Sequence, residues 1–114
     1  MKERQEILNG FAVEMRRGTV VLSVLSRLQS PKYGYSLIQE LKQNEFGVEA
    51  NTLYPLLRRL EKQGILRSEW ETQGAKPRKY YVLTDFGKEI FEELKTYWKN
   101  MQSYLNVLVN GEDC

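Results

Sequence analysis

Residues 49–83, EANTLYPLLRRLEKQGILRSEWETQGAKPRKYYVL, decide the fold of this chain of 114 residues. Leucines at positions 53, 56, 57 and 60 recur at a spacing that places them on one face of a helix. Gly64 has the position of a helix C-terminal cap. Two segments of β-forming residues, 65–70 and 79–83, then flank a turn-rich, basic tip. The stretch therefore predicts a helix followed at once by a β-hairpin.

The opposite face of this helix is polar and cationic. A proline inside a helix is costly beyond the first turn, so Pro55 indicates a helix start close to Glu49–Asn51. A basic face can read base edges in a groove while a basic ribbon grips phosphate. A solvated surface helix is the alternative, which the adjacent basic hairpin disfavours. The exposed residues are expected to be Asn51, Tyr54, Arg58, Arg59 and Lys62.

The hairpin tip carries three cations, Lys76, Arg78 and Lys79. We expect them to clamp the DNA backbone or to reach the adjacent minor groove, the alternative being a merely soluble turn. Upstream, apolar spacing predicts an amphipathic helix over residues 4–16, a break at Gly18, a buried helix over 19–28, another over 35–42 and a connector at 44–47. Three helices followed by a basic hairpin are the winged helix-turn-helix plan.

The net charge of +2 is too small to indicate a nucleic-acid partner by itself, but it is unevenly distributed. Residues 52–83 hold seven cations and three anions, whereas residues 84–114 hold three cations and six anions. Attraction to phosphate is therefore concentrated in the middle of the chain.

Composition also excludes several function classes. Without histidine, and with one cysteine, Cys114, the chain cannot form a Ser-His or Cys-His pair or the usual zinc sites. No phosphate-binding glycine pattern occurs either. We expect no catalytic residue, no metal site, no cofactor and no enzyme activity. The absence of a long apolar run or a signal peptide predicts no membrane partner and a cytoplasmic location.

Both ends of the chain carry apolar stripes. The C-terminal stripe has alternating spacings of three and four residues, which is typical of a coiled-coil seam, and the N-terminal stripe is its expected partner from a second subunit. Such a homodimer would present two copies of the helix that carries Arg58 to successive major grooves, about 34–36 Å apart, on a pseudo-palindromic operator. The interface residues are expected to be Ile7, Leu8, Phe11, Met15, Phe91, Leu94, Trp98, Met101, Leu105 and Leu108.

The expected fold class is mainly α with a small β-wing (α+β): a winged helix-turn-helix plus an N-terminal helix and a long C-terminal dimerisation helix. Residues 1–16 would pack on the dimer interface, residues 17–83 would bind DNA, and residues 84–114 would form the dimerisation helix with a frayed acidic tail.

Trp98 lies in the middle of the C-terminal stripe, where it would approach its symmetry mate. A small hydrophobic or aromatic effector, such as a planar drug or a phenolic acid, could insert beside it, with Phe11, Met15 and Met101 as neighbours. Simple filling of the dimer interface explains Trp98 equally well.

The sequence resembles the PadR family of bacterial winged-helix transcriptional regulators, in its short form with one C-terminal helix. The matching segments are RGT at 17–19, YGYSL at 33–37, NTLYPLLRRLEKQGIL at 51–66, PRKYYVLT at 77–84 and Gly87. The resemblance implies a homodimeric repressor of a nearby efflux or detoxification operon, with Thr52, Tyr54, Arg58 and the wing cations touching double-stranded DNA. Asn51 departs from the small residue common in the family, and its amide could contact a base or cap the helix.

A protein of another class remains an alternative. Winged helices also serve as protein-protein adaptors, whose basic face meets an acidic partner without sequence-specific DNA binding. Salt dependence separates the two, because a dimer that neutralises about 6–10 phosphates loses about 10³–10⁵ in DNA affinity between 50 and 200 mM salt.

Overall fold

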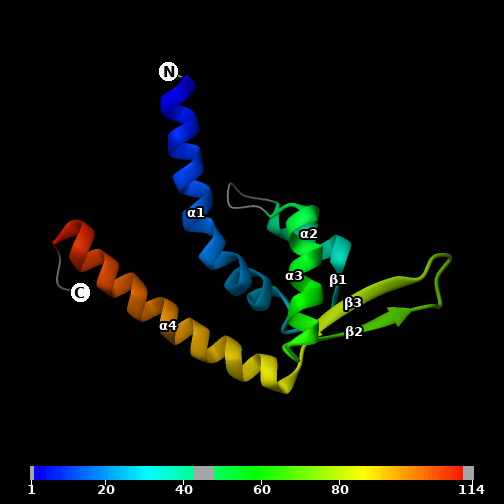
Figure 1. The fold of residues 1–114 in the computed structure, drawn as a ribbon. Coiled ribbons are helices and arrows are strands. Elements are labelled where there is room, and N and C mark those ends of the chain that lie inside the picture. Colours follow the sequence, from blue (N-terminus) through cyan, green and yellow to red (C-terminus); the bar gives the residue numbers. More distant parts are fainter. Residues whose placement is uncertain (1, 43–47, 112–114) are drawn as a thin grey trace.

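The computed structural model describes residues 2–42 and 48–111 and has the expected mainly helical winged-helix architecture (Figure 1). The connector at 44–47, the acidic tail and Cys114 lie outside the described residues. The elements, in chain order, are α1 (Lys2–Arg27), β1 (Lys32–Tyr33), α2 (Gly34–Leu41), α3 (Ala50–Lys62), β2 (Leu66–Glu71), β3 (Arg78–Leu83) and α4 (Asp85–Asn110).

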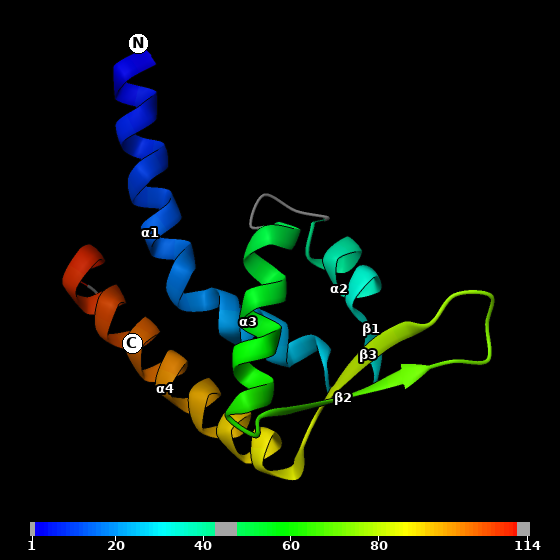
Figure 2. The same cartoon turned by 45° about the vertical axis from the view of Figure 1, so that its right-hand side comes forward.

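The first helix differs from the sequence-based expectation. The predicted break at Gly18 is wrong, because α1 continues through it without a positive φ angle. Glycine in a helix interior costs about 1 kcal/mol, which weakens a helix without ending it. The C-terminal part of α1 is anchored in the core by Val24 and Leu25, and Leu28, directly after the helix, is buried with them. The proposed boundary between residues 16 and 17 therefore falls inside one helix, whose N-terminal half stands away from the sheet (Figure 2).

The core lies where the C-terminal part of α1, α2, the leucine face of α3, the base of the hairpin and the start of α4 meet. Burial of this apolar surface is the main term that holds the elements together. The largest fully buried side chains are Val24, Leu25, Leu28, Leu37, Leu53, Leu57 and Leu66.

The sheet has three antiparallel strands in the order β1-β3-β2. The short strand β1 was not predicted, since two residues are too few for a periodic signal. It pairs Tyr33 with Tyr80, and β2 pairs Trp70 with Lys79 further along β3. The sheet extends away from α1 and α4 in both views (Figures 1 and 2).

The junction between hairpin and α4 is fixed by short polar contacts. Gly64 adopts a φ of 78°, the left-handed geometry that a helix C-terminus favours, as predicted. The Thr84 hydroxyl donates to the Gly64 carbonyl at 2.6 Å and accepts from the Gly87 amide at 2.9 Å. Thr84 is thus the N-cap of α4 and ties it to the end of α3.

No helix within residues 2–42 and 48–111 combines the length and the apolar character that crossing a membrane requires.

Candidate nucleic-acid interface

The helix α3 has an apolar face and a polar face, as the sequence predicts. Its leucines at 53, 56, 57 and 60 are at most 9% exposed and face the core. The helix begins at Ala50, so the predicted start is confirmed. Pro55 has no amide hydrogen, so it donates no helical hydrogen bond to the Asn51 carbonyl. Both residues lie on the exposed side of α3. The residues predicted for DNA contact on this helix are all exposed: Asn51, Thr52, Tyr54, Arg58, Arg59 and Lys62.

One flank of α3 packs against the start of α2. Gly34 is buried there, and a β-carbon at position 34 would lie 2.9 Å from Cε1 and 3.2 Å from the hydroxyl oxygen of Tyr54. The Tyr54 ring is therefore held against the α2 backbone, while 36% of the residue stays exposed. Tyr54 therefore has a fixed position on the flank of α3 that faces α2.

The other flank of α3 faces α1. Thr52 and Arg59 line a groove together with Arg17 and Val20 of α1. Because successive helical residues are about 100° apart, Arg59 points toward this groove, whereas Arg58 and Lys62 lie on the outermost face. The expected DNA-contacting residues of α3 are thus divided between two surfaces.

The outer face of the wing is an aromatic cluster. The Arg78 guanidinium lies 4.4 Å from the centre of the Tyr33 ring, and Tyr33 meets Tyr80 edge to face at 6.1 Å. The Tyr80 hydroxyl donates to Glu69 at 2.8 Å, a hydrogen bond that raises the pKa of Tyr80. Arg78 is exposed but held by its stacking on Tyr33, so its position is better defined than that of Lys76 at the open tip.

The inner face of the wing gives one of its cations a partner within the protein. Lys79 was expected to clamp the DNA backbone or reach the minor groove, a role that stays a prediction, and its Nζ lies 3.8 Å from Glu61 of α3 and above the Tyr81 ring. Glu61 also accepts a hydrogen bond of 2.5 Å from the Ser68 hydroxyl of β2. Side chains alternate along a strand, so Lys79 shares the α3-facing side with buried Tyr81. Lys79 therefore joins the wing to α3 rather than extending freely from the tip.

Tyr81 lies at the bottom of the corner between α3 and the wing and is 5% exposed. Burial raises the pKa of Tyr81, and the nearby Glu61 carboxylate raises it further. The phenol therefore stays neutral and carries no charge into the corner.

The two apolar stripes are largely uncovered. In the N-terminal stripe, exposure ranges from 53% at Leu8 to 79% at Met15. In the C-terminal stripe, Trp98 is 41% and Leu108 61% exposed. Phe91 is the exception, at 5% exposed, because it packs into the core of its own subunit. Phe91 therefore has almost no surface to offer to an expected dimer seam, and the first partly exposed residue of this stripe is Leu94.

The sequence and the fold match those of known regulators. The family described as Transcriptional regulator PadR-like family matches residues 21–93. The chain belongs to this PadR-like family. A solved PadR family transcriptional regulator from Eggerthella lenta is 43% identical, with a TM-score of 0.91 over 98% of this chain and 100% of that one.

Two further relatives are more distant. A solved PadR-like transcriptional regulator from Bacillus cereus is 31% identical, with a TM-score of 0.76 over 87% of this chain and 99% of that one. The transcriptional regulator Rv3488 of Mycobacterium tuberculosis is 35% identical over 81 residues, which cover 70% of this chain and 76% of that protein. The printed names describe both proteins as transcriptional regulators, and the Bacillus cereus protein also carries the PadR-like name.

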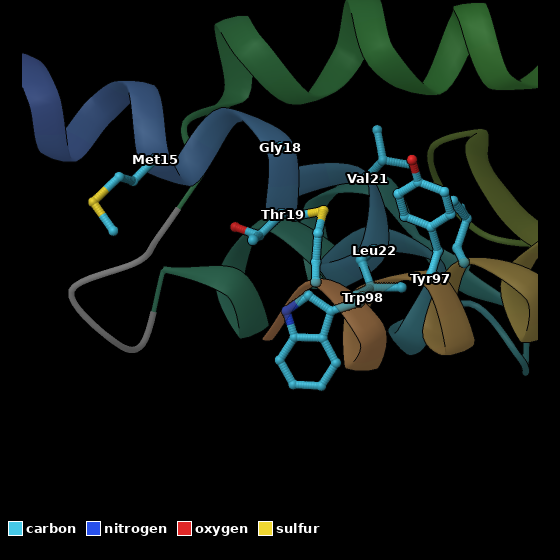
Figure 3. Close-up of a pocket in the computed structure, with 9 residues that line it drawn as sticks. Met15, Gly18, Thr19, Val21, Leu22, Tyr97 and Trp98 are labelled. Carbon is cyan, nitrogen blue, oxygen red and sulfur yellow. The ribbon is translucent and has the colours of Figure 1, made fainter. Parts of the chain in front are cut away.

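The expected effector residues of this PadR-like protein lie only partly together. Met15, Trp98 and Met101 line a cavity of about 360 Å³ between α1 and α4, together with Leu22 and Tyr97 (Figure 3). Met15 lies at one side of the cavity in that view, away from Trp98. Phe11 does not line the cavity. Three of the four expected effector residues therefore line this cavity within one chain, and the place of Phe11 stays a prediction for the dimer.

Sequence reasoning missed three residues that shape the PadR-like interface. No sequence pattern singled out Glu61, although it accepts a hydrogen bond from Ser68 and pairs with Lys79. Tyr33 and Gly34 were noted only as part of a motif, yet they position Arg78 and Tyr54. These roles depend on pairs 7 to 45 positions apart that lie in different helices and strands, for which period-based reasoning has no signal.

Proposed function

We propose that the protein is a homodimeric, DNA-binding transcriptional repressor in which α3 enters the major groove. The observation that carries the proposal is the two-sided character of α3: its leucine face is buried, whereas Asn51, Arg58 and Lys62 are exposed together. Arginine can hold a guanine edge through two parallel hydrogen bonds, and asparagine can do so with adenine. Membership of a family of transcriptional regulators supports the same role.

The wing supplies a second contact in this proposal. Arg78 is fixed by Tyr33, and Lys76 lies exposed at the tip, so both can reach the DNA backbone beside the groove that α3 occupies. Lys79 acts indirectly, because its contact with Glu61 sets the angle between wing and helix.

The homodimer rests on the two exposed stripes. A chain that leaves Ile7, Phe11, Trp98 and Leu108 between 41% and 62% exposed has a large uncovered apolar surface, which is typical of an interface. Pairing of α1 with α4 of a second copy would cover both stripes. The two α3 helices would then meet half-sites about 34–36 Å apart.

The proposed regulated genes are a nearby efflux or detoxification operon, and the proposed effector is a hydrophobic or aromatic molecule beside Trp98. The cavity between α1 and α4 supports such a ligand, since tryptophan offers stacking area and methionine adapts its shape. An effector lowers the affinity for DNA only if it binds more tightly to dimers in which the spacing of the two α3 helices does not match the two half-sites.

The test of DNA binding is a titration of labelled duplex DNA from the promoter upstream of the gene, followed by fluorescence anisotropy. We expect preference for one inverted repeat over a scrambled duplex and a loss of about 10³–10⁵ in affinity between 50 and 200 mM salt. Weak binding that ignores sequence would instead support the adaptor function.

The effector is tested by tryptophan fluorescence in a Trp70→Phe variant, which leaves Trp98 as the one tryptophan of the chain. Planar aromatic drugs and phenolic acids should quench this emission while the dimer persists. Unchanged emission with every compound would leave Trp98 a filler of the interface.

A further inference from the structure

A second groove lies between α1 and α3, apart from the cavity at Trp98. It consists of two adjoining hollows of about 480 and 410 Å³, which share Arg17, Val20 and Thr52. Each hollow is within the size range of sites for small molecules. The groove takes one wall from each of the two helices.

The charge in this groove is concentrated at one end. Arg17 of α1 and Arg59 of α3 line the same hollow with the Thr52 hydroxyl, and no carboxylate lines it. Neither arginine forms a salt bridge with any side chain within residues 2–42 and 48–111. The other hollow is lined by Glu49 as well as by Arg16 and Arg17, so the Arg17–Arg59 end is the one where an anion meets no carboxylate.

Part of the groove is apolar. Val13, Val20 and Val48 form an apolar strip in the hollow that leads away from Arg59, which Arg16, Arg17, Glu49 and Thr52 also line, and Leu56 lines the hollow that holds Arg59. A cationic end joined to a valine-lined channel is complementary to a molecule with an anionic head and an apolar tail.

The groove lies on a separate face of α1 from the proposed dimer stripe. At about 100° per residue, Val13, Arg17 and Val20 point away from the side that carries Met15 and Leu22. Met15 and Leu22 line the cavity against α4, and neither lines the groove. Dimerisation through the Met15 side would therefore leave the groove open.

We infer that the groove between α1 and α3 binds a small amphipathic carboxylate, with its head between Arg17 and Arg59 and its tail along Val20, Val13 and Val48. The carboxylate accepts hydrogen bonds from the two guanidinium groups, and the tail removes valine surface from water. Binding here requires neither DNA nor Trp98.

The bound carboxylate also weakens DNA binding, an effect that rests on the proposed function. Thr52 and Arg59 belong to α3, the helix that enters the major groove of the operator. A carboxylate bound between α1 and α3 therefore occupies Arg59 and places a negative charge beside the approaching DNA phosphates. Ligand and operator therefore compete, and each lowers the affinity for the other by the same factor.

The binding step is tested by isothermal titration of the full-length protein with sodium octanoate at low salt. We expect saturable binding, no matching heat with the uncharged octanamide, and about fourfold tighter binding for each added methylene from hexanoate to octanoate, from about 0.8 kcal/mol per buried methylene. Arg17→Gln and Arg59→Gln should each weaken octanoate binding about tenfold. Arg67→Gln, an exposed arginine on the wing, is the matched control and should not change it.

Three outcomes would overturn the inference: equal binding of octanoate and octanamide, equal loss in Arg67→Gln, or loss in Trp98→Leu instead of Arg17→Gln. The regulatory step has its own readout, the operator affinity with and without octanoate. Arg17→Gln should keep its affinity for DNA alone within about twofold and lose the octanoate effect. If no operator is found, the titration without DNA still decides whether the groove binds carboxylates.

Discussion

Gly87, in the first turn of α4, packs directly on the backbone carbonyl of Ile65. A β-carbon at position 87 would lie 2.1 Å from the Ile65 oxygen, which is too close for any real contact. The neighbour is a backbone atom, so it cannot rotate away as a side chain would. This contact therefore sets how closely α4 approaches the end of α3 and the base of the wing.

We expect Gly87→Ala to lower the free energy of unfolding by about 1–3 kcal/mol or more, because α4 must move away from Ile65. Urea denaturation measures the change. Gly18→Ala is the matched control: a β-carbon there meets nothing within 4 Å, so alanine should be neutral or stabilise by up to about 1 kcal/mol. A destabilised Gly18→Ala would contradict a continuous α1.

Gly34→Ala should affect DNA binding more than stability. The added methyl group displaces the Tyr54 ring, a side chain that can move, so the cost in unfolding free energy should stay below about 1 kcal/mol. Operator affinity should fall several-fold. A double-mutant cycle provides the check: in a Tyr54→Ala background, Gly34→Ala should have no further effect on affinity.

Arg58→Ala should weaken operator binding by about 1–3 kcal/mol if Arg58 reads a base edge. Anisotropy titration at fixed salt measures the effect. Arg67→Ala is the control, since Ser68 faces α3 and its neighbour Arg67 points to the opposite side of the strand. Equal weakening on operator and scrambled DNA would make Arg58 a phosphate contact.

Leu105→Arg should shift the dimer toward monomer by at least tenfold, because it would bury a charge without a partner in the proposed seam. Sedimentation velocity at micromolar concentration measures the distribution. Ser103→Arg places the same side chain on the other side of α4, where both residues are exposed in one subunit, and should leave the mass unchanged. A wild-type protein that sediments as a monomer would remove the dimer.

The ion pairs of Glu40 give a pH dependence. The hydrogen bond from Arg27 at 2.8 Å, with Lys32 nearby, lowers the pKa of Glu40 below its ordinary value of 4.5. The stabilisation is therefore present above pH 4.5 and is lost as the pH falls through the lower folded-state value.

Glu40→Gln should accordingly cost at most about 1 kcal/mol in unfolding free energy near neutral pH, since both partners are partly exposed. The difference between wild type and variant should shrink as the pH falls below 4.5 and Glu40 becomes protonated. Urea denaturation at neutral pH and at a series of lower pH values measures it. A difference that does not change with pH would show that packing, rather than charge, explains the effect.

The sequence alone determined which residues share a face. The leucines of α3, the polar residues opposite them and the turn at Gly64 all follow from helical spacing and backbone preference, which act between neighbours in the chain. For the same reason, the winged-helix order of elements and the family resemblance could be identified before any coordinates were considered.

Only the tertiary structure decided what each face meets. In the folded chain α1 continues through Gly18, and Phe91 is buried in the core. Lys79 pairs with Glu61, and Arg59 lines the same hollow as Arg17. The spacing of apolar residues along the chain specifies a direction around a helix axis. It does not specify which distant segment lies in that direction, because that depends on how separate elements pack to bury their apolar surface.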